Sequence, residues 1–428
     1  MQTHTYQNGF RLVYQHMDNP ETSIQLYCDF GSIHEPADVR GAAHFIEHMC
    51  FKGTKALKDT RTLSAVFDRS GSFLNAFTDR RTTCYYVSGT TTDFALKINT
   101  LCDMMINSVF NPVEYNKEHS VVREEMHKDA DDAELTAIEN ADKHLFSGTP
   151  YALPVDALEY HVDGKLPRQS VYEIYKKHYI PANFILSICS SLGWSQIKHV
   201  IDNCLLAKAP VTLPQQPSLS MSLTPILKPV YETVYQPGLS TTHLCVGFRT
   251  CGRTHADMPK LLFSAAALSS TMNARMFFVF REKHGLSYTS SCETDFFEQF
   301  GAIRFYVECD TKKFLKNGNK PGAYQVMRNL IHDLRTDGLT SHEFNLTRGY
   351  LEGQMTLKAQ DPTQITSHNG EQLLFGDSAT VLYSDFYNHY IKPLTLASVN
   401  ACLTQYLDLS IAVVSVVSSD KGLLGKIK

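Results

Sequence analysis

Two histidines and a glutamate lie within five residues of one another in the segment Gly41–Thr54, GAAHFIEHMCFKGT. On a helix, His44 and His48 share one face because they are four residues apart, and Glu47 lies close to that face. Two imidazoles at this spacing can each reach one zinc ion at about 2.0–2.1 Å. The glutamate beside them can act on a water molecule at the metal. The residues alone predict either a zinc site or a helix that carries two solvated histidines.

A catalytic zinc site needs a third protein ligand and an open position for water. The segment 116–134, NKEHSVVREEMHKDADDAE, is predicted to be helical and offers many donor side chains. Spacing alone does not choose among them, because an acidic helix is usually a solvated surface. Glu118 and Glu125, seven residues apart, share one helix face. The candidates are Glu118, His119, Glu124, Glu125, His127 and several aspartates.

The composition is that of a globular protein with room for two cores. The chain has 428 residues, of which 43% are hydrophobic and 20% charged, and this length is typical of two domains. A formal net charge of -4 gives no field that favours nucleic acid or an anionic membrane, and we expect neither as a partner. Eleven cysteines occur without a CxxC pair, and the N-terminus has no secretory or transit pattern. We therefore expect reduced thiols and a cytoplasmic protein.

The two halves of the chain resemble each other. Residues 23–38, SIQLYCDFGSIHEPAD, parallel residues 242–257, THLCVGFRTCGRTHAD. Near the ends of the halves, residues 166–189 align without a gap with residues 394–417, and both predict a capped helix followed by an apolar strand. This similarity predicts one ancestral unit of about 200 residues that is present twice.

The repeat predicts two homologous domains, residues 1–207 and 231–428, joined by a Pro-, Ser- and Gln-rich linker at 208–230. Strands and helices mix in each domain without regular βαβ alternation. This pattern predicts the α+β class, with helices packed on one face of a mainly antiparallel sheet. The second copy lacks the metal motif: the positions of His44, Glu47 and His48 fall on Phe263, Ala266 and Ala267.

The segment GAAHFIEHMCFKGT resembles the pitrilysin, insulin-degrading enzyme and mitochondrial processing peptidase family, whose HxxEH motif inverts the zincin signature. The glutamate ligand of that family falls on Glu125 of this chain, and a supporting glutamate falls seven residues earlier, on Glu118. The resemblance implies that His44, His48 and Glu125 hold one zinc ion per chain. It also implies that Glu47 is the general base and that Glu118 orients a ligand.

A second stretch, residues 71–89, alternates Thr, Tyr and Phe and is predicted to form two strands around a polar turn. From the residues alone it is an ordinary internal hairpin. It resembles the NAxT…TxYY stretch of the family, where an edge strand pairs with the substrate backbone. The matching residues are Asn75, Ala76, Phe77, Thr78, Thr83 and Tyr85.

In the second half, residues 281–288, REKHGLSY, resemble the REKxGLxY motif of the family. Gly285 is predicted to end a helix, which puts Arg281 in the last helical turn and Tyr288 at the start of a strand. The alternative is a surface arginine at a favourable helix end and a core tyrosine. In the family, this pair faces the zinc across a chamber and contacts the substrate carbonyl, where negative charge develops during the reaction.

The resemblance implies a zinc metalloendopeptidase that hydrolyses unfolded peptides or peptide segments in an enclosed chamber. A chain with two units, the zinc motif and the Arg/Tyr pair implies a homodimer, with a heterodimer with a related subunit as the alternative. The rival function is a non-catalytic scaffold, or a partner subunit of a heterodimeric processing peptidase. A redox or regulatory zinc site at Cys50 is less favoured, because no other cysteine lies at ligand spacing.

Overall fold

The structure is a computed structural model in which the chain forms two compact units. The described residues are 1–156, 166–213, 221–316, 318, 320–376 and 381–427. The first unit comprises Met1–His127, Pro154–Leu219 and Thr356–Ser384. The second unit comprises Lys128–Leu153, Ser220–Met355 and Asp385–Lys428.

These units differ from the contiguous domains 1–207 and 231–428 that the sequence predicted, since each takes up a segment from the opposite half of the chain. Lys128–Leu153 belongs to the second unit and Thr356–Ser384 to the first. The physical reason is that a helix in each of these segments covers a sheet face of the unit that it joins. The expected contiguous domains are therefore replaced by two units that each contain a helix from the opposite half of the chain.

The expected linker 208–230 contains neither helix nor strand in the part that the structure describes between Lys208 and Val230. Residues 214–220 of it lie outside the described residues.

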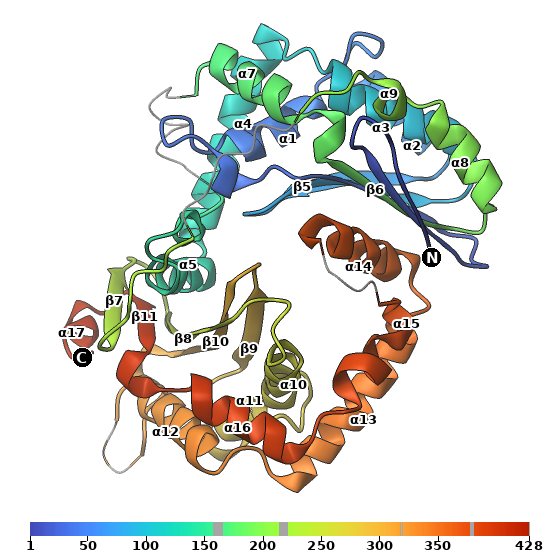
Figure 1. The fold of residues 1–428 in the computed structure, drawn as a ribbon. Helices are drawn as coiled ribbons and strands as arrows, with labels where there is room; N and C mark the ends of the chain where they lie inside the picture. Colours follow the sequence, from blue (N-terminus) through green and yellow to red (C-terminus); the bar gives the residue numbers. More distant parts are fainter. Residues whose placement is uncertain (157–165, 214–220, 317, 319, 377–380, 428) are drawn as a thin grey trace. The chain divides into compact units, whose positions relative to one another are not determined.

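The first unit is built on a six-stranded sheet with the order β1-β2-β6-β3-β5-β4 (Figure 1). The β2–β6 pair is parallel and every other neighbouring pair is antiparallel. β4 pairs with β5 alone among the described strands, so its other edge is unpaired. The strands are β1 (Gln2–Thr5), β2 (Arg11–His16), β3 (Thr22–Cys28), β4 (Phe73–Thr78), β5 (Thr83–Gly89) and β6 (Phe184–Ser190).

The second unit repeats this topology in a five-stranded sheet with the order β7-β11-β8-β10-β9. Its β7–β11 pair is parallel and the remaining neighbours are antiparallel, as in β2-β6-β3-β5-β4. Matching strand order and direction confirm the internal repeat and the mainly antiparallel sheets. The strands are β7 (Val230–Tyr235), β8 (Thr241–Cys251), β9 (Thr289–Phe296), β10 (Phe300–Asp310) and β11 (Val413–Ser418).

The rest of each unit consists of connecting segments, short 3-10 and π-helical turns, and α-helices. Those of the first unit are α1 (Ala42–Cys50), α2 (Thr60–Asp68), α3 (Phe94–Asn107), α7 (Arg168–His178), α8 (Trp194–Asp202), α9 (Leu205–Lys208) and α14 (Pro362–Phe375). Those of the second are α5 (Ala133–Leu145), α10 (Met258–Ser269), α11 (Arg275–Phe277), α12 (Ala323–Thr336), α16 (Leu396–Tyr406) and α17 (Lys421–Leu424). The helices α4 (Pro112–Asp131), α13 (Ser341–Lys358) and α15 (Tyr383–Phe386) contribute residues to both units.

Strand β3 shows why helices must cover both faces of the sheet in the first unit. Alternate side chains of a strand point to opposite faces. Leu26 packs in the main core with Phe45 of α1, whereas Tyr27 packs in a separate cluster with Leu374 of α14. Figure 1 shows α1 and α14 on opposite faces of this sheet. The expected helical layer on one face is present, and the helix on the other face comes from the far half of the chain.

The second unit receives α5 in the same way. This helix packs on β8 and β11, and Leu145 fits where Gly247 has no side chain: a Cβ at that glycine would lie 2.7 Å from Leu145 Cδ1. The guanidinium of Arg304 on β10 holds both carboxylate oxygens of Asp142 on α5, at 2.7 and 3.0 Å. Both side chains are buried, so the exchanged helix is attached by apolar packing and by a buried ion pair.

Across the part of the chain that the structure describes, we find no helix with the length and apolar character that a bilayer crossing requires.

Candidate metal centre

Helix α1 carries the two histidines, and its first turn is held by a carboxylate from the preceding loop. Gly41 precedes the helix with φ of 84°, a conformation that favours glycine. The Glu35 carboxylate accepts hydrogen bonds from the backbone N–H groups of Gly41 and Ala43, at 2.9 and 2.7 Å. Burial raises the pKa of Glu35 to about 7, although the two N–H groups oppose the rise. Phe45 and Ile46 are fully buried and fix the opposite side of the helix.

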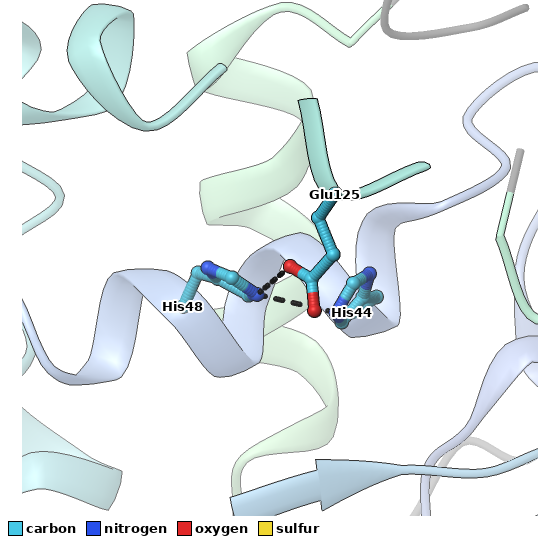
Figure 2. Close-up of side chains that lie close together, drawn as sticks. All are labelled: His44, His48 and Glu125. Atoms are coloured by element: carbon cyan, nitrogen blue, oxygen red, sulfur yellow. Dashed lines mark hydrogen bonds and ion pairs between the residues drawn. The ribbon is translucent and has the colours of Figure 1, made fainter. Parts of the chain in front are cut away.

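The Nε2 atoms of His44 and His48 lie 3.1 Å apart. Glu125 reaches them from α4, with Oε2 3.4 Å from His48 Nε2 (Figure 2). One ligand atom from each of the three residues lies within 4.8 Å of the others. Sequence spacing left the third ligand open, and the fold brings Glu125 to the histidines.

This donor set fits a zinc ion. Two donors bound tetrahedrally at 2.0–2.1 Å are about 3.3–3.4 Å apart, close to the separation of the two Nε2 atoms. Two imidazoles and one carboxylate also form one of the three-ligand sets found in catalytic zinc sites. The Nδ1 atoms of both rings face carboxylates, which leaves the two Nε2 atoms for a metal.

Glu118 is the carboxylate beside His48. Its Oε1 lies 2.9 Å from His48 Nδ1, and Lys52 Nζ lies 2.6 Å from Oε2. Burial alone would raise the pKa of Glu118, but hydrogen bonds from His48 and Lys52, and their charges, hold it below its usual value. The structure thus brings Glu118 to the position expected of an orienting residue.

Asp156 is the carboxylate beside His44, and the sequence analysis missed it. Its Oδ1 lies 3.0 Å from His44 Nδ1, off the direction of a well-formed hydrogen bond from the ring. The Arg40 side chain donates to the carbonyl of Pro154 at 2.6 Å and thereby ties this segment to the start of α1. The sequence around Asp156 has neither helical nor strand periodicity, so no spacing rule could have predicted that this residue lies beside His44.

Glu47 is buried next to the two histidines. Thr78 Oγ1 donates a hydrogen bond of 2.6 Å to Glu47 Oε2. Burial raises the pKa of Glu47, and the hydrogen bond from Thr78 and the neighbouring imidazoles oppose that rise. The carboxylate is therefore close to the metal ligands and fixed on one side by strand β4.

Strand β4 contains the four predicted substrate residues at the sheet edge. Side chains alternate along it: Asn75 and Phe77 are exposed, while Ala76 and Thr78 are partly buried. Ala76 packs against the main core. Its other backbone edge has no partner strand among the described residues, and the Ala76 N–H donates to Asn75 Oδ1 at 2.9 Å.

Arg281 and Tyr288 lie in the second unit. The helical stretch ends at Lys283, and Gly285 adopts φ of 59°, as expected for a residue that ends a helix. The Arg281 guanidinium stacks on the Tyr288 ring at 4.5 Å, and Tyr288 is 81% exposed. The tyrosine is thus a surface residue rather than a core residue. The two residues contact each other, and their relation to His44 and His48 stays a prediction.

The other donors near the motif do not join the three-residue cluster. His119 packs on Phe45 and approaches the carbonyl of Leu166. Glu124 and His127 are absent from the metal-binding group found among the described residues. Cys50 is fully buried, and burial raises the pKa of its thiol to about 12, which disfavours a thiolate ligand.

A repeated α/β unit, with an HxxEH helix in one copy and a glutamate from a later helix beside it, defines the inverted-zincin class. Comparisons with known proteins agree with this class. Residues 11–157 match the family model described as Insulinase (Peptidase family M16). Residues 165–351 match the model described as Peptidase M16 inactive domain. The chain therefore belongs to peptidase family M16, the insulinase family.

Two relatives are similar over most of their length. The chain is 27% identical over 425 residues to the uncharacterized zinc protease YmxG of Bacillus subtilis, covering 96% of this chain and 97% of that protein. It is 26% identical over 410 residues to an uncharacterized zinc protease of Mycobacterium leprae, covering 94% and 88%. The solved structure of a protease from Helicobacter pylori shares the fold, with a TM-score of 0.88, 15% identity and coverage of 97% and 99%.

Proposed function

We propose that the protein is a zinc-dependent endopeptidase that hydrolyses unfolded peptides. The observation that carries this proposal is the convergence of His44, His48 and Glu125, with the buried carboxylate of Glu47 beside them. The names of the relatives, zinc proteases, support the same reaction class.

Each residue near the centre has a distinct role in this proposal. His44, His48 and Glu125 hold the ion, which would supply Lewis acidity toward a water molecule and the scissile carbonyl. Glu47 takes a proton from that water molecule and later delivers a proton to the leaving amine. Thr78 holds one oxygen of Glu47, so the other is left to exchange the proton.

The unpaired edge of β4 would hold the substrate as an added strand. Main-chain hydrogen bonds from Asn75 to Thr78 would bind an extended peptide regardless of its sequence, which favours unfolded substrates. Arg281 and Tyr288 would contact the carbonyl oxygen on which negative charge develops. Enclosure of the substrate in a chamber is part of this proposal and rests on the resemblance to the family.

We further propose a homodimer in which Arg281 and Tyr288 of one chain serve the metal centre of the other. The proposal rests on the two-unit length of the chain and on the presence of both motifs in it. A Glu47→Gln chain mixed with an Arg281→Ala chain should regain part of the lost cleavage activity. Failure to regain it, when mass measurements show a mixed dimer, would rule out sharing between chains.

The primary test measures zinc content and cleavage of a quenched, unstructured peptide. We expect one zinc ion per chain in the wild type and in Glu47→Gln, with cleavage lost only in the variant. Glu125→Gln should lose zinc, while its exposed neighbour Glu124→Gln should keep both zinc and activity. A wild type without zinc, or a Glu47→Gln chain that cleaves normally, would instead support the rival non-catalytic scaffold.

A further inference from the structure

The second unit contains a cavity of about 750 Å³ whose wall is rich in lysine. It lies between the segments 283–286, 312–315 and 320–321, and the basic side chains in its wall are Lys283, His284, Lys312, Lys313 and Lys320. Among the described residues that line it, none is acidic. A cavity of this size is within the range that binds ligands in proteins.

Basic side chains outnumber acidic ones around the cavity. Of the lysines in its wall, Lys283, Lys312 and Lys320 take part in no ion pair with the described residues. Three carboxylates lie nearby: Glu282 lies 3.6 Å from Arg281, Asp310 accepts from the backbone N–H of Lys312, and Asp333 lines a neighbouring cavity together with Lys283 and His284. Burial, and then the charge of Lys283, lower the pKa of His284.

The donors in the wall favour separated carboxylates over a compact phosphate. Phosphate sites typically use clustered backbone N–H groups or the arginine fork. Here the N–H groups of Gly285 and Leu286 already donate to the carbonyls of Arg281 and Phe280, and the lining residues that the structure describes include no arginine. The remaining donors are lysine ammonium groups on flexible stems, which act as separate point charges.

The cavity shares a wall with the Arg281–Tyr288 segment. Gly285 and Leu286 lie between these two residues in sequence and line the cavity. Lys313 Nζ donates a hydrogen bond of 2.9 Å to the Gly285 carbonyl and so attaches the lysine-rich segment to this loop. A peptide held by Arg281 and Tyr288 would therefore pass close to the lysines.

We propose that this lysine cavity binds an acidic segment of the peptide substrate, so that the enzyme prefers peptides with several Asp or Glu residues outside the cleaved bond. The inference rests on the proposed peptidase function, because the ligand is taken to be the substrate.

The test uses the full Glu47→Gln chain, so that peptides bind without being cleaved, and reads the fluorescence anisotropy of labelled peptides. An unstructured peptide with a run of Glu residues is compared with the same peptide carrying Gln. We expect about tenfold tighter binding of the acidic peptide at low salt, because several modest ion pairs act together. The preference should vanish near 1 M salt, where charges are screened within about 3 Å.

Two double variants isolate the cavity. Lys312→Gln/Lys320→Gln should abolish the preference, and Lys312→Arg/Lys320→Arg should retain it. Lys392→Gln/Lys426→Gln, which removes the same charge from exposed positions outside the cavity, should leave the preference intact. Equal binding of the acidic and neutral peptides, or equal losses in both Gln variants, would overturn the proposal.

A competition experiment compares tripolyphosphate with unlabelled acidic peptide. If tripolyphosphate displaces the labelled acidic peptide at the lower concentration, the cavity is assigned to phosphate ligands and the proposal is overturned. Cleavage of the neutral peptide by the wild type reports on the proposed function separately. An acidic preference in binding without any cleavage would contradict the peptidase function and leave the lysine cavity as a binding site for acidic peptides.

Discussion

Thr78 on the edge strand β4 donates a 2.6 Å hydrogen bond to Glu47 on the metal-binding helix α1. The bond joins the strand proposed to hold the substrate to the carboxylate proposed to move the proton. Thr78 would thus have a second role beside its place in the proposed substrate strand, because its side chain points inward while Phe77 points to solvent.

Thr78→Val should slow catalysis without removing the metal. The loss of one hydrogen bond to a buried carboxylate corresponds to about 1.5–3 kcal/mol, which predicts a kcat lower by roughly 10- to 100-fold. Thr78→Ser keeps the hydroxyl and should retain most activity. Zinc content and kcat of the three proteins check this, and normal kcat in Thr78→Val would contradict a positioning role.

Glu118→Gln and Asp156→Asn should each weaken zinc binding. Both carboxylates face a histidine Nδ1 at about hydrogen-bonding distance, and loss of such a partner typically costs 10- to 100-fold in metal affinity. Competition with a chromophoric chelator measures the zinc Kd. Glu114→Gln, on the same helix α4 in an exposed pair with Lys117, is the control and should leave the Kd unchanged. An unchanged Kd in Asp156→Asn would mean that its contact with His44 is incidental.

Gly370→Ala should destabilise the first unit. A Cβ at this position of α14 would lie 2.4 Å from Tyr27 Cε2 and 3.2 Å from Ser187 Cβ, so the helix would have to move away from the sheet. Overpacking of this kind costs about 1–3 kcal/mol. Gly349→Ala, at an exposed site of α13 with open space around it, should instead stabilise by about 0.5–1 kcal/mol. Urea unfolding midpoints should move in opposite directions, and equal midpoints would contradict close packing of α14.

Asp142→Asn should destabilise the second unit strongly. Arg304 would keep its charge in a buried position while losing one of its two carboxylate partners, since it also contacts Asp295. Breaking a buried pair in this way costs about 3–5 kcal/mol. The exposed pair between Lys117 and Glu114 provides the contrast, because Glu114→Gln should cost at most about 1 kcal/mol. Thermal unfolding of the two variants compares them, and a similar change in Tm would show that the Asp142 pair adds no more than a surface contact.

Local chemistry was predictable because it depends on short spacing. The i, i+4 separation of His44 and His48 fixes their common face on any α-helix, and the alternation in residues 71–89 fixes a hairpin. Gly285 ends its helix because glycine accepts a positive φ. Glu125 required more than spacing, since several acidic residues on α4 were equivalent until the resemblance to a family distinguished one of them.

The sequence by itself determined the helix with two histidines, the hairpin at residues 71–89 and the internal repeat, because each is encoded by neighbouring residues or by direct similarity. Only the tertiary structure decided that α5 and α14 cover the sheet of the opposite half, that Asp156 approaches His44, and that Thr78 holds Glu47. These contacts join residues from 31 to more than 100 positions apart. They depend on which buried surfaces fit together, and no local periodicity records that fit.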